Sequence, residues 1–199
     1  MQYKGQSILN YGDISTLSFH ATKLFHTIEG GAIITNDDEL AKKIRLLINF
    51  GITGPTSIES IGINAKMNEF EAAMGLCVLD EIEKISQQRR LIWQTYQQEL
   101  KGLVQFQQFN EYSNNNYAYV PVIFESEQQR EKVEQALKEH DIIPRRYFYP
   151  SLESLDYLQK NQVCKNSRNI TSRVLCLPIY SELQSGEQLE VIKVIKEVL

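Results

Sequence analysis

Residues 14–35 decide the fold, and they read ISTLSFHATKLFHTIEGGAIIT. The first part, Ile14 to His20, is rich in β-branched and aromatic residues, and a second short apolar run extends from Gly31 to Thr35. Short runs of this kind, bounded by glycine or polar residues, are typical of strands. The stretch therefore predicts two strands joined by a loop that carries Lys23 among several polar side chains.

Helical patterns follow this pair of strands. Asn36 or Asp37 is expected to cap a helix whose first turn is acidic. This helix is expected to end at Gly51. Residues 51–62 contain three glycines, a proline and several hydroxyl side chains, so we expect a long exposed loop, which often carries function. The strongest helical signal covers residues 68–100, where apolar residues recur at steps of three and four. A helix of this length commonly connects two substructures.

The composition changes after Gly102, and we place a domain boundary there. Residues 1–102 are expected to form one domain together with the long helix, and residues 103–199 a small α+β domain. The Gln- and Asn-rich stretch 105–116 is expected to be a polar loop. Beyond it, the sequence predicts strands over residues 117–124, 142–149 and 174–177, and helices over residues 126–140 and 185–199.

The composition excludes several classes of protein. The chain has 199 residues, of which 42% are hydrophobic, which is enough to build a buried core. The formal net charge is −4 without any run of five or six like charges, so we expect no nucleic-acid partner. No apolar run approaches the roughly 20 residues that span a bilayer, and the first residues lack the apolar segment of a signal peptide. We therefore expect neither membrane insertion nor secretion.

The cysteines point to a reducing compartment. Cys77, Cys164 and Cys176 form an odd set without CxxC spacing, which argues against a disulfide framework and against a zinc site. We therefore expect no metal. Cys77 and Cys176 fall on apolar faces and are expected to be buried packing residues. The expected location of the protein is the cytoplasm.

The densest cluster of reactive side chains is Ser18 to Lys23. On a strand, Ser18 and His20 would project to the same face just before Lys23 leaves the strand end. A single lysine is nevertheless most often a solvated surface charge, and a single histidine is most often structural. The residue types alone leave the function open.

Longer segments of the sequence carry a family resemblance. Ser18 to Lys23, with Glu29 to Asp37 behind it, resembles the signature of the DegT/DnrJ/EryC1/StrS aminotransferases, which use pyridoxal 5′-phosphate (PLP) to aminate nucleotide-linked keto-sugars. Gly62 to Ala73, Pro144 to Pro150 and Leu175 to Pro178 resemble further motifs of that family. The resemblance implies an α/β fold, namely the C-terminal part of a fold-type I PLP-dependent aminotransferase, with a partial large domain followed by a small α+β domain.

The resemblance assigns the catalytic and cofactor-binding role to Lys23. A transaminase needs an amine that bonds to the aldehyde of the cofactor and then moves a proton between cofactor and substrate, which lysine can do. Related sugar dehydratases of the same fold have a histidine at this position, so the lysine implies amine transfer. Ser18 is expected to donate a hydrogen bond to the cofactor phosphate, and His20 is expected to support the site.

Asn64 is the third expected cofactor-binding residue. In the resembling enzymes an asparagine near this point reaches the phosphate in the neighbouring subunit, which implies a homodimer with shared active sites. In some family members the donor lies two residues later, which is Lys66 here. The alternative is that Asn64 caps the following helix, a role for which Asn68 is the better candidate.

Arg145 and Tyr147 are the expected substrate-binding residues. A guanidinium group pairs with phosphate oxygens in a bidentate manner, and tyrosine can stack on or hydrogen-bond to a sugar, so Arg145, Arg146 and Tyr147 suit a nucleotide diphosphate and its sugar. The alternative is a solvated basic pair. His26 and Glu29 are expected to shape the approach to the lysine.

In the resembling enzymes, about half of the chain precedes the strand that leads to the lysine. That half supplies the aromatic side chain that stacks on the cofactor ring and the carboxylate that keeps the pyridine nitrogen of the cofactor protonated. Residues 1–17 contain no equivalent, so we expect that this chain does not transaminate by itself. The first hypothesis is a part of a longer PLP-dependent enzyme that transfers an amino group from an amino acid, most simply glutamate, to a nucleotide-linked keto-deoxysugar, with dTDP as the expected nucleotide. The alternative is a catalytically incomplete fragment that acts only as a dimerising or carbohydrate-binding module.

Overall fold

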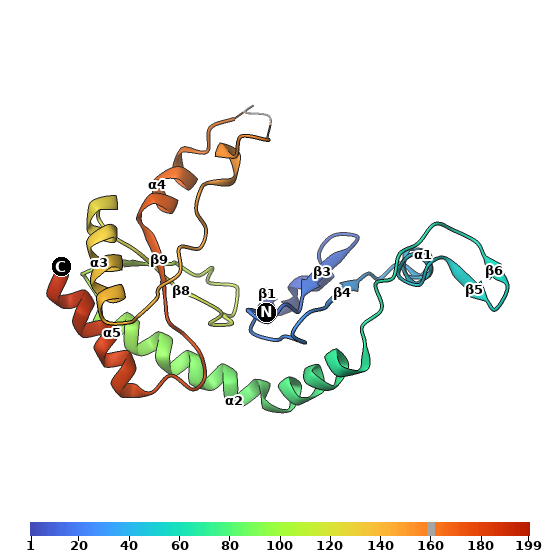
Figure 1. Ribbon diagram of the computed structural model, residues 1–199, viewed down its shortest axis with the longest axis horizontal. Helices are drawn as coiled ribbons and strands as arrows, with labels where there is room; N and C mark the ends of the chain where they lie inside the picture. Colours follow the sequence, from blue (N-terminus) through green and yellow to red (C-terminus); the bar gives the residue numbers. More distant parts are fainter. Residues whose placement is uncertain (159–161) are drawn as a thin grey trace. The chain divides into compact units, whose positions relative to one another are not determined.

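The computed structural model describes residues 1–158 and 162–199, and it forms two compact units. Unit 1 comprises Met1–Glu83 and Asn110–Asn115, and unit 2 comprises Lys84–Phe109 and Asn116–Leu199. One long helix, α2 (Glu69–Glu99), contributes its first half to unit 1 and its second half to unit 2 (Figure 1). The domain boundary after Gly102 stays a prediction. Among the described residues, no helix is both long enough and apolar enough to cross a bilayer.

Unit 1 consists of short elements that pair locally. Strands β3 and β4 form an antiparallel ladder in which Ser18 opposes Gly31, which confirms the two predicted strands. The predicted loop over residues 51–62 is exposed as expected, but it contains a short hairpin. The elements of unit 1 that precede α2 are β1 (Gln2–Tyr3), β2 (Gln6–Ser7), η1 (Ile8–Asn10), β3 (Ser15–Ser18), β4 (Gly31–Ile34), α1 (Asp38–Ile48), β5 (Ile52–Gly54) and β6 (Ser57–Ile58).

Helix α1 begins and ends as its sequence indicates. Asp37 Oδ1 accepts hydrogen bonds from two backbone N–H groups of the first turn, at 2.8 and 3.0 Å. After the last turn, the Gly51 N–H donates to Leu46 O at 2.7 Å, with a φ of +73° that favours glycine. A Cβ at Gly51 would lie 1.8 Å from Ser60 O, so a larger residue does not fit.

Helix α2 begins with a reciprocal cap and matches the predicted span to within one residue at each end. Asn68 Oδ1 accepts from the Glu71 N–H at 3.0 Å, and Glu71 Oε2 accepts from the Asn68 N–H at 3.1 Å. In unit 1, however, Leu76 of this helix is exposed, and so is Cys77. The prediction that Cys77 is buried is wrong, because nothing in unit 1 covers the side of the helix that carries Cys77, although the neighbouring Val78 is buried.

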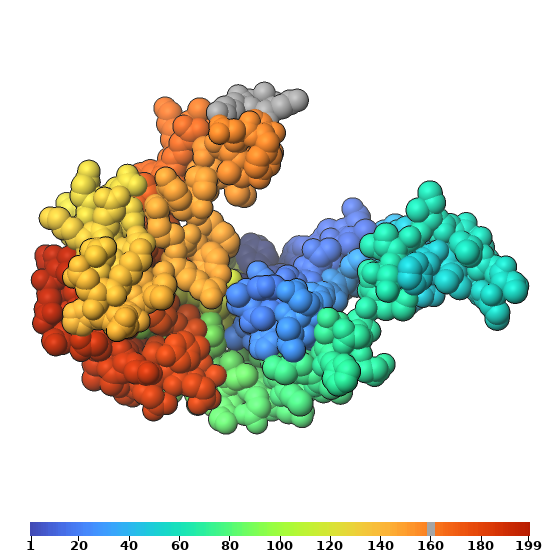
Figure 2. Space-filling view, viewed as in Figure 1, coloured from blue at the N-terminus to red at the C-terminus, as the bar shows by residue number. Residues whose placement is uncertain are grey.

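Unit 2 is built on an antiparallel sheet with the strand order β7-β8-β9. Helices α3 and α5 lie side by side, in yellow and red in Figure 2, and pack with α2 against one face of this sheet. The predicted strand 174–177 and the helices 126–140 and 185–199 are confirmed. The elements are β7 (Gln105–Phe106), β8 (Val120–Ile123), α3 (Glu127–Glu139), η2 (Leu152–Ser154), α4 (Lys165–Arg173), β9 (Val174–Leu177) and α5 (Ser185–Val198).

The core of unit 2 is continuous and apolar. It joins the second half of α2 to α3, α5 and alternate residues of β8 and β9, as the period of two along a strand requires. Its fully buried members are Tyr96, Leu100, Val120, Val122, Val133, Leu137, Leu175 and Ile195.

Pro121 explains why β7 is short. The N–H and C=O groups of Cys176 bond to Arg145, on the side of β9 away from β8, so Pro121, which opposes Cys176, directs its backbone nitrogen toward β7. Proline has no N–H to donate, and the pairing with β7 ends at Phe106↔Val122. The predicted polar loop 105–116 therefore contains a strand of only two residues.

The predicted strand over residues 142–149 is wrong. Only Arg145 pairs with β9, through two hydrogen bonds with Cys176 of 3.1 and 2.8 Å. In the same register Ile143 would oppose Pro178, which has no N–H, so the ladder cannot extend in that direction. Helix α4, which no periodicity in the sequence indicates, follows this segment.

Candidate active site

The loop between β3 and β4 carries Lys23, and three backbone hydrogen bonds close it. The Phe19 N–H donates to Gly30 O and the Thr27 N–H donates to Phe19 O, each at 2.9 Å. The Lys23 N–H donates to His20 O at 2.9 Å and forms a turn within the loop. These bonds define the Lys23 loop, residues 19–30, whose backbone position does not depend on the lysine side chain.

A close contact with α2 holds the Lys23 loop. Thr27 is only 2% exposed, and its hydroxyl donates to Glu29 O. A Cβ at Gly75 of α2 would lie 2.8 Å from the Thr27 Cγ2 atom, so the loop and the helix approach this closely only because residue 75 is glycine. Phe19 and Phe25 pack edge to face with ring centroids 4.8 Å apart.

Gly30 is required by its backbone and by its neighbours. Its φ is +145°, a conformation that side-chain-bearing residues rarely adopt. A Cβ there would lie 2.5 Å from Thr27 Oγ1 and 2.9 Å from Met67 Cε. Met67, which lies just before α2, is therefore close to Gly30 at the end of the Lys23 loop.

Lys23 and Ser18 present unused polar groups. Lys23 is exposed, and its amine makes no hydrogen bond or ion pair within the part of the chain that the structure describes. Ser18 Oγ accepts from the His20 N–H at 3.5 Å, and its hydroxyl proton has no acceptor among the same residues. The two predicted site residues thus lie at one end of the β3–β4 hairpin with a free amine and a free hydroxyl donor.

His20 bridges the two ends of the Lys23 loop. The Thr22 N–H donates to His20 Nδ1 at 3.2 Å, so the neutral ring carries its proton on Nε2, which lies 3.4 Å from Glu29 Oε1. The Thr22 hydroxyl lies 2.9 Å from the same Nδ1. His26 makes a different contact, since its Nδ1 accepts from the Ile28 N–H at 3.4 Å. His20 therefore supports the loop through Glu29, whereas among the described residues His26 bonds within its own turn.

Asn64 lies in the segment between β6 and α2. It pairs with Asn49 in an isolated bridge, and its Oδ1 accepts from the Lys66 N–H at 3.5 Å. The Lys66 ammonium lies 4.3 Å from the ring centroid of Phe50. Since Asn68 caps α2, the capping alternative for Asn64 is wrong, and the structure shows no contact of Asn64 with Lys23 among the described residues.

Arg145 and Tyr147 meet in unit 2. Arg145 Nη1 donates to the Tyr147 hydroxyl at 2.5 Å, and its Cζ atom lies 5.5 Å from the Tyr147 ring centroid. Arg146 Cζ lies 3.7 Å from the Tyr149 ring centroid. The two predicted substrate-binding residues are therefore in contact, and both arginines pack on aromatic rings.

Arg89 is a structurally important residue that no motif in the sequence indicates. Its guanidinium donates to Tyr117 O, Ala118 O and Ile179 O at 3.0, 2.6 and 2.9 Å. Burial lowers the pKa of Arg89, although the nearby Tyr119 hydroxyl opposes this shift. Arg89 thus links α2 by hydrogen bonds to the segments before β8 and after β9. A single arginine in a helix gives no sequence signal for this role.

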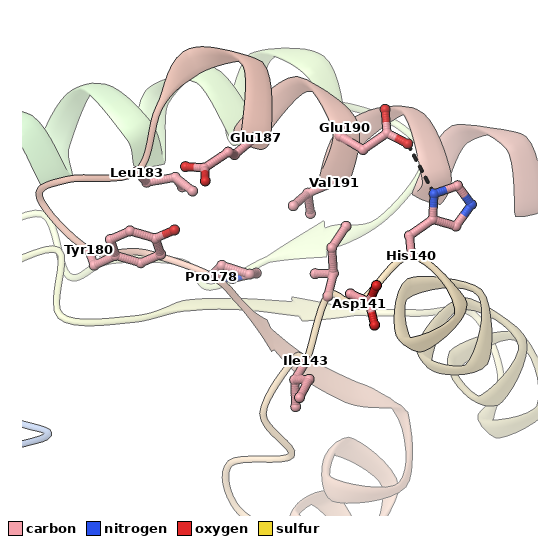
Figure 3. A pocket seen from close by; sticks show the side chains of 10 residues that line it. His140, Asp141, Ile143, Pro178, Tyr180, Leu183, Glu187, Glu190 and Val191 are labelled. Carbon is pink, nitrogen blue, oxygen red and sulfur yellow. Dashed lines mark ion pairs between the residues drawn. The ribbon is translucent and has the colours of Figure 1, made fainter.

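A cavity of about 470 Å³ in unit 2 lies apart from the predicted site residues of that unit (Figure 3). His140 Nδ1 pairs with Glu190 Oε1 at 3.0 Å at one end, and Tyr180 faces Glu187 at the other. Burial, followed by the charge of Glu187, raises the pKa of Tyr180. Neither Arg145 nor Tyr147 lines this cavity.

Comparisons with known proteins agree with the motifs. The family model of the DegT/DnrJ/EryC1/StrS aminotransferase family matches residues 1–196. A relative from Shigella dysenteriae, named dTDP-4-amino-4,6-dideoxy-D-glucose transaminase, is 40% identical over 199 residues, which cover 96% of this chain and 54% of the relative. A GDP-perosamine synthase from Escherichia coli O157:H7 is 27% identical, with 98% of this chain and 54% of that protein covered. The chain thus spans about half the length of these relatives.

Solved structures show the same fold. The structure of DesI determined in the presence of its TDP-sugar product superposes with a TM-score of 0.88 at 31% identity, and covers 98% of this chain and 52% of that chain. The aminotransferase TlmJ from Streptoalloteichus hindustanus superposes with a TM-score of 0.92 at 21% identity, over 99% of this chain and 55% of that one, and supports the fold alone. The mixed α/β architecture is that of the C-terminal part of a PLP-dependent sugar aminotransferase. With a family model that matches nearly its whole length, the chain belongs to the DegT/DnrJ/EryC1/StrS aminotransferase family.

Proposed function

We propose that this chain supplies the lysine and the substrate-binding residues of a PLP-dependent enzyme that transfers an amino group from an amino acid to a dTDP-linked keto-deoxysugar, as part of a longer protein. The observation that carries the proposal is the Lys23 loop, which holds a free amine close in sequence to the free hydroxyl donor of Ser18. The names of the relatives do not favour the alternative of a purely dimerising or carbohydrate-binding module.

The residues of unit 1 fit the cofactor that the family uses. An amine without an ion pair is the group that an aldehyde needs, and the Ser18 hydroxyl and the Asn64 amide are donors that suit a phosphate. When bound, PLP supplies an electron sink for the negative charge that develops on the substrate carbon as it loses a proton. Lys23 would hold the cofactor, and Ser18 and Asn64 would bind its phosphate.

Lys23 then has a second task. Once its amine is free again, Lys23 Nζ can take the proton from the carbon that loses the amino group and return a proton at the carbon that gains it. The bonds that close the loop fix the backbone of residues 19–30, so only the side chain of Lys23 has to move between these positions. The contact of Thr27 with Gly75 supports the same geometry from α2.

The substrate and the assembly are further parts of the proposal. Arg145 would bind the diphosphate and Tyr147 the sugar, and the name of the relative from Shigella dysenteriae supports a dTDP-linked sugar. We propose glutamate as the amino donor. A homodimer in which Asn64 serves the partner's cofactor, located in the cytoplasm, completes the proposal.

The test is a chimera in which the preceding half of the Shigella dysenteriae relative is joined to this chain. With PLP, glutamate and a dTDP-linked 4-keto-6-deoxysugar, the chimera is expected to form an amino sugar nucleotide, which mass spectrometry detects together with 2-oxoglutarate. The Lys23→Ala chimera is expected to form none.

Two controls make the result specific. His26→Ala changes a neighbouring loop side chain whose ring accepts a hydrogen bond from the Ile28 N–H, and it should leave most of the product. An unchanged rate in the Lys23→Ala chimera would refute the role of Lys23, and an active monomer would refute the role of Asn64 in a partner subunit.

A further inference from the structure

A second cavity in unit 2, of about 590 Å³, lies on the face of the sheet opposite the core. Its floor consists of Pro121 and Ile123 of β8 and Val174 and Cys176 of β9, which alternate with the buried core residues of the same strands. Small-molecule sites commonly have volumes of roughly 300–1,000 Å³ and mostly apolar walls. The size and the floor of this cavity are therefore those of a ligand site.

Aromatic rings form one wall of the cavity. Tyr119 and Tyr147 pack edge to face with centroids 5.4 Å apart, and Tyr147 and Phe148 have centroids 4.9 Å apart. Phe148 is 64% exposed, so one large apolar ring of this wall remains uncovered. Exposed aromatic faces of this kind bind planar rings by stacking.

Hydroxyl groups also line the cavity, and no charged residue does so among the described residues. Ser167 and Thr171 come from α4, and Ser151 is buried and bonds to Ser167 at 2.6 Å. Burial raises the pKa of the Cys176 thiol in the floor to about 11, against the lowering effect of its contact with Tyr147 O. The thiol stays protonated at neutral pH, so the floor is neutral as well.

Positive charge lies directly beside this neutral cavity. Arg145 bonds to Tyr147, which is itself part of the aromatic wall. Arg146 donates to the carbonyl oxygen of Thr171 at 3.3 Å, and its Nε–H is buried without a partner among the described residues. A fully apolar ligand would make no use of these two cations, whereas a ligand with a planar ring at one end and phosphates at the other would match both features.

We propose that this cavity binds the nucleobase of a nucleoside diphosphate, with the aromatic wall stacked on the base and Arg145 on the diphosphate. The inference rests on the proposed function, because it assigns the nucleotide part of the same substrate to a place in unit 2. It adds Phe148, Tyr119 and Ile170 to the residues that determine which nucleotide binds.

The test measures binding of dTDP, thymidine and inorganic pyrophosphate to the 199-residue chain by calorimetry. Ile170→Trp fills the cavity from α4 and is expected to weaken dTDP and thymidine binding by about tenfold or more without changing pyrophosphate binding. Phe148→Ala removes an exposed ring with little burial, so it should fold normally and weaken the same two ligands. Arg145→Ala should weaken dTDP and pyrophosphate and leave thymidine unchanged.

Tyr180→Ala is the matched control, because it removes a partly exposed aromatic ring that lines the other cavity of unit 2. It is expected to leave all three affinities unchanged. Equal dTDP affinity in the wild type, Ile170→Trp and Phe148→Ala, or no dTDP binding at all, would overturn the nucleobase site. The proposed function would not fall with it, because the dependence of amino transfer on Lys23 in the chimera tests that function separately.

Discussion

Units 1 and 2 bury their apolar side chains to very different extents. In unit 2, residues from α2, α3, α5, β8 and β9 form one continuous core. In unit 1, which the structure describes completely, Val78 is the only buried hydrophobic residue, and Leu17, Ile33 and Leu76 are exposed. The predicted catalytic lysine is in the unit that has almost no core.

The two units are therefore ordered by different forces. Burial of apolar area dominates in unit 2, whereas unit 1 relies mainly on local contacts: backbone hydrogen bonds, helix caps, the Phe19–Phe25 ring pair and the approach of Thr27 to Gly75. Exposed apolar surface on this scale is typical of a face that packs against another protein segment. The difference teaches that the geometry of the Lys23 loop depends on a few local contacts, whereas the stability of unit 2 depends on its shared core.

Substitution of one helical leucine in each unit compares most directly how much buried side chains stabilise the two units. Leu137 in α3 is 0% exposed, and Leu137→Ala is expected to lower the free energy of unfolding by about 2–5 kcal/mol because it leaves a cavity. Leu76 in α2 is 65% exposed, and Leu76→Ala should cost about 0.5 kcal/mol or less. Urea unfolding, followed by far-ultraviolet circular dichroism, which reports the helices of both units, measures both values. Equal losses would mean that unit 1 has a core after all.

Two glycines in helices test the Lys23 loop. Gly75→Ala places a methyl group 2.8 Å from Thr27 Cγ2, and we expect a loss of about 1–3 kcal/mol in local stability, which exceeds the gain in helix propensity. Gly186 in α5 has nothing within 4 Å of an added Cβ, so Gly186→Ala should be neutral or stabilise by up to about 1 kcal/mol. Hydrogen exchange of the Thr27 N–H reports the first effect. Protection that is unchanged in Gly75→Ala would show that α2 does not hold the loop.

The stability of unit 2 is expected to fall in acid because of Glu134. Burial alone would raise the pKa of Glu134, but hydrogen bonds from Lys138 and Arg130 outweigh it, and the pKa lies below the ordinary value of 4.5. A pKa depressed by folding gives stability that is present above the unfolded value and is lost as the pH falls through the folded value. Glu134→Gln should therefore flatten the pH dependence of the unfolding transition, followed by the fluorescence of Trp93 in unit 2, below about pH 4.5. Glu139→Gln, which removes an exposed carboxylate of the same helix, should leave that dependence in place.

The smallest expected effect concerns the His20–Glu29 pair. Both side chains are partly exposed, and such pairs contribute about 1 kcal/mol or less, so His20→Ala should speed hydrogen exchange of the Lys23 N–H by up to about fivefold. His26→Ala, the matched change in the same loop, should leave this exchange rate unchanged. Equal acceleration in both variants would mean that neither histidine supports the lysine specifically.

The sequence predicts the elements whose signals are local. Asp37 and Ser126 occupy cap positions, and their helices begin at the next residue. Helix α4 has no apolar periodicity that would predict it. It is held instead by a hydrogen bond that Arg168 Nε donates to Glu153 Oε1 at 2.6 Å. Residues 142–149 have a strand-like composition, but Pro178 on the facing strand prevents the ladder from extending.

In the candidate site, too, local sequence signals predict some residues, and contacts between distant residues cannot be predicted. Lys23 and Ser18 stand out because the family motif is contiguous in sequence. The contact of Thr27 with Gly75 and the three carbonyl groups around Arg89 join residues that are far apart in the chain, so no pattern of spacing predicts them. Residue types can suggest that a loop is reactive, but only the fold shows which glycine allows it to pack.

The central claim is that Lys23 is the amine that holds the cofactor, and peptide mapping after borohydride reduction with PLP tests it most directly. We expect the reduced adduct on the peptide that contains Lys23 at low PLP concentration, and no adduct there in Lys23→Ala. Lys66→Ala serves as the control, because its ammonium packs on Phe50 and it should not change the modification of Lys23. A reducible adduct that persists at the same level in Lys23→Ala, or one that maps first to another lysine, would contradict the account.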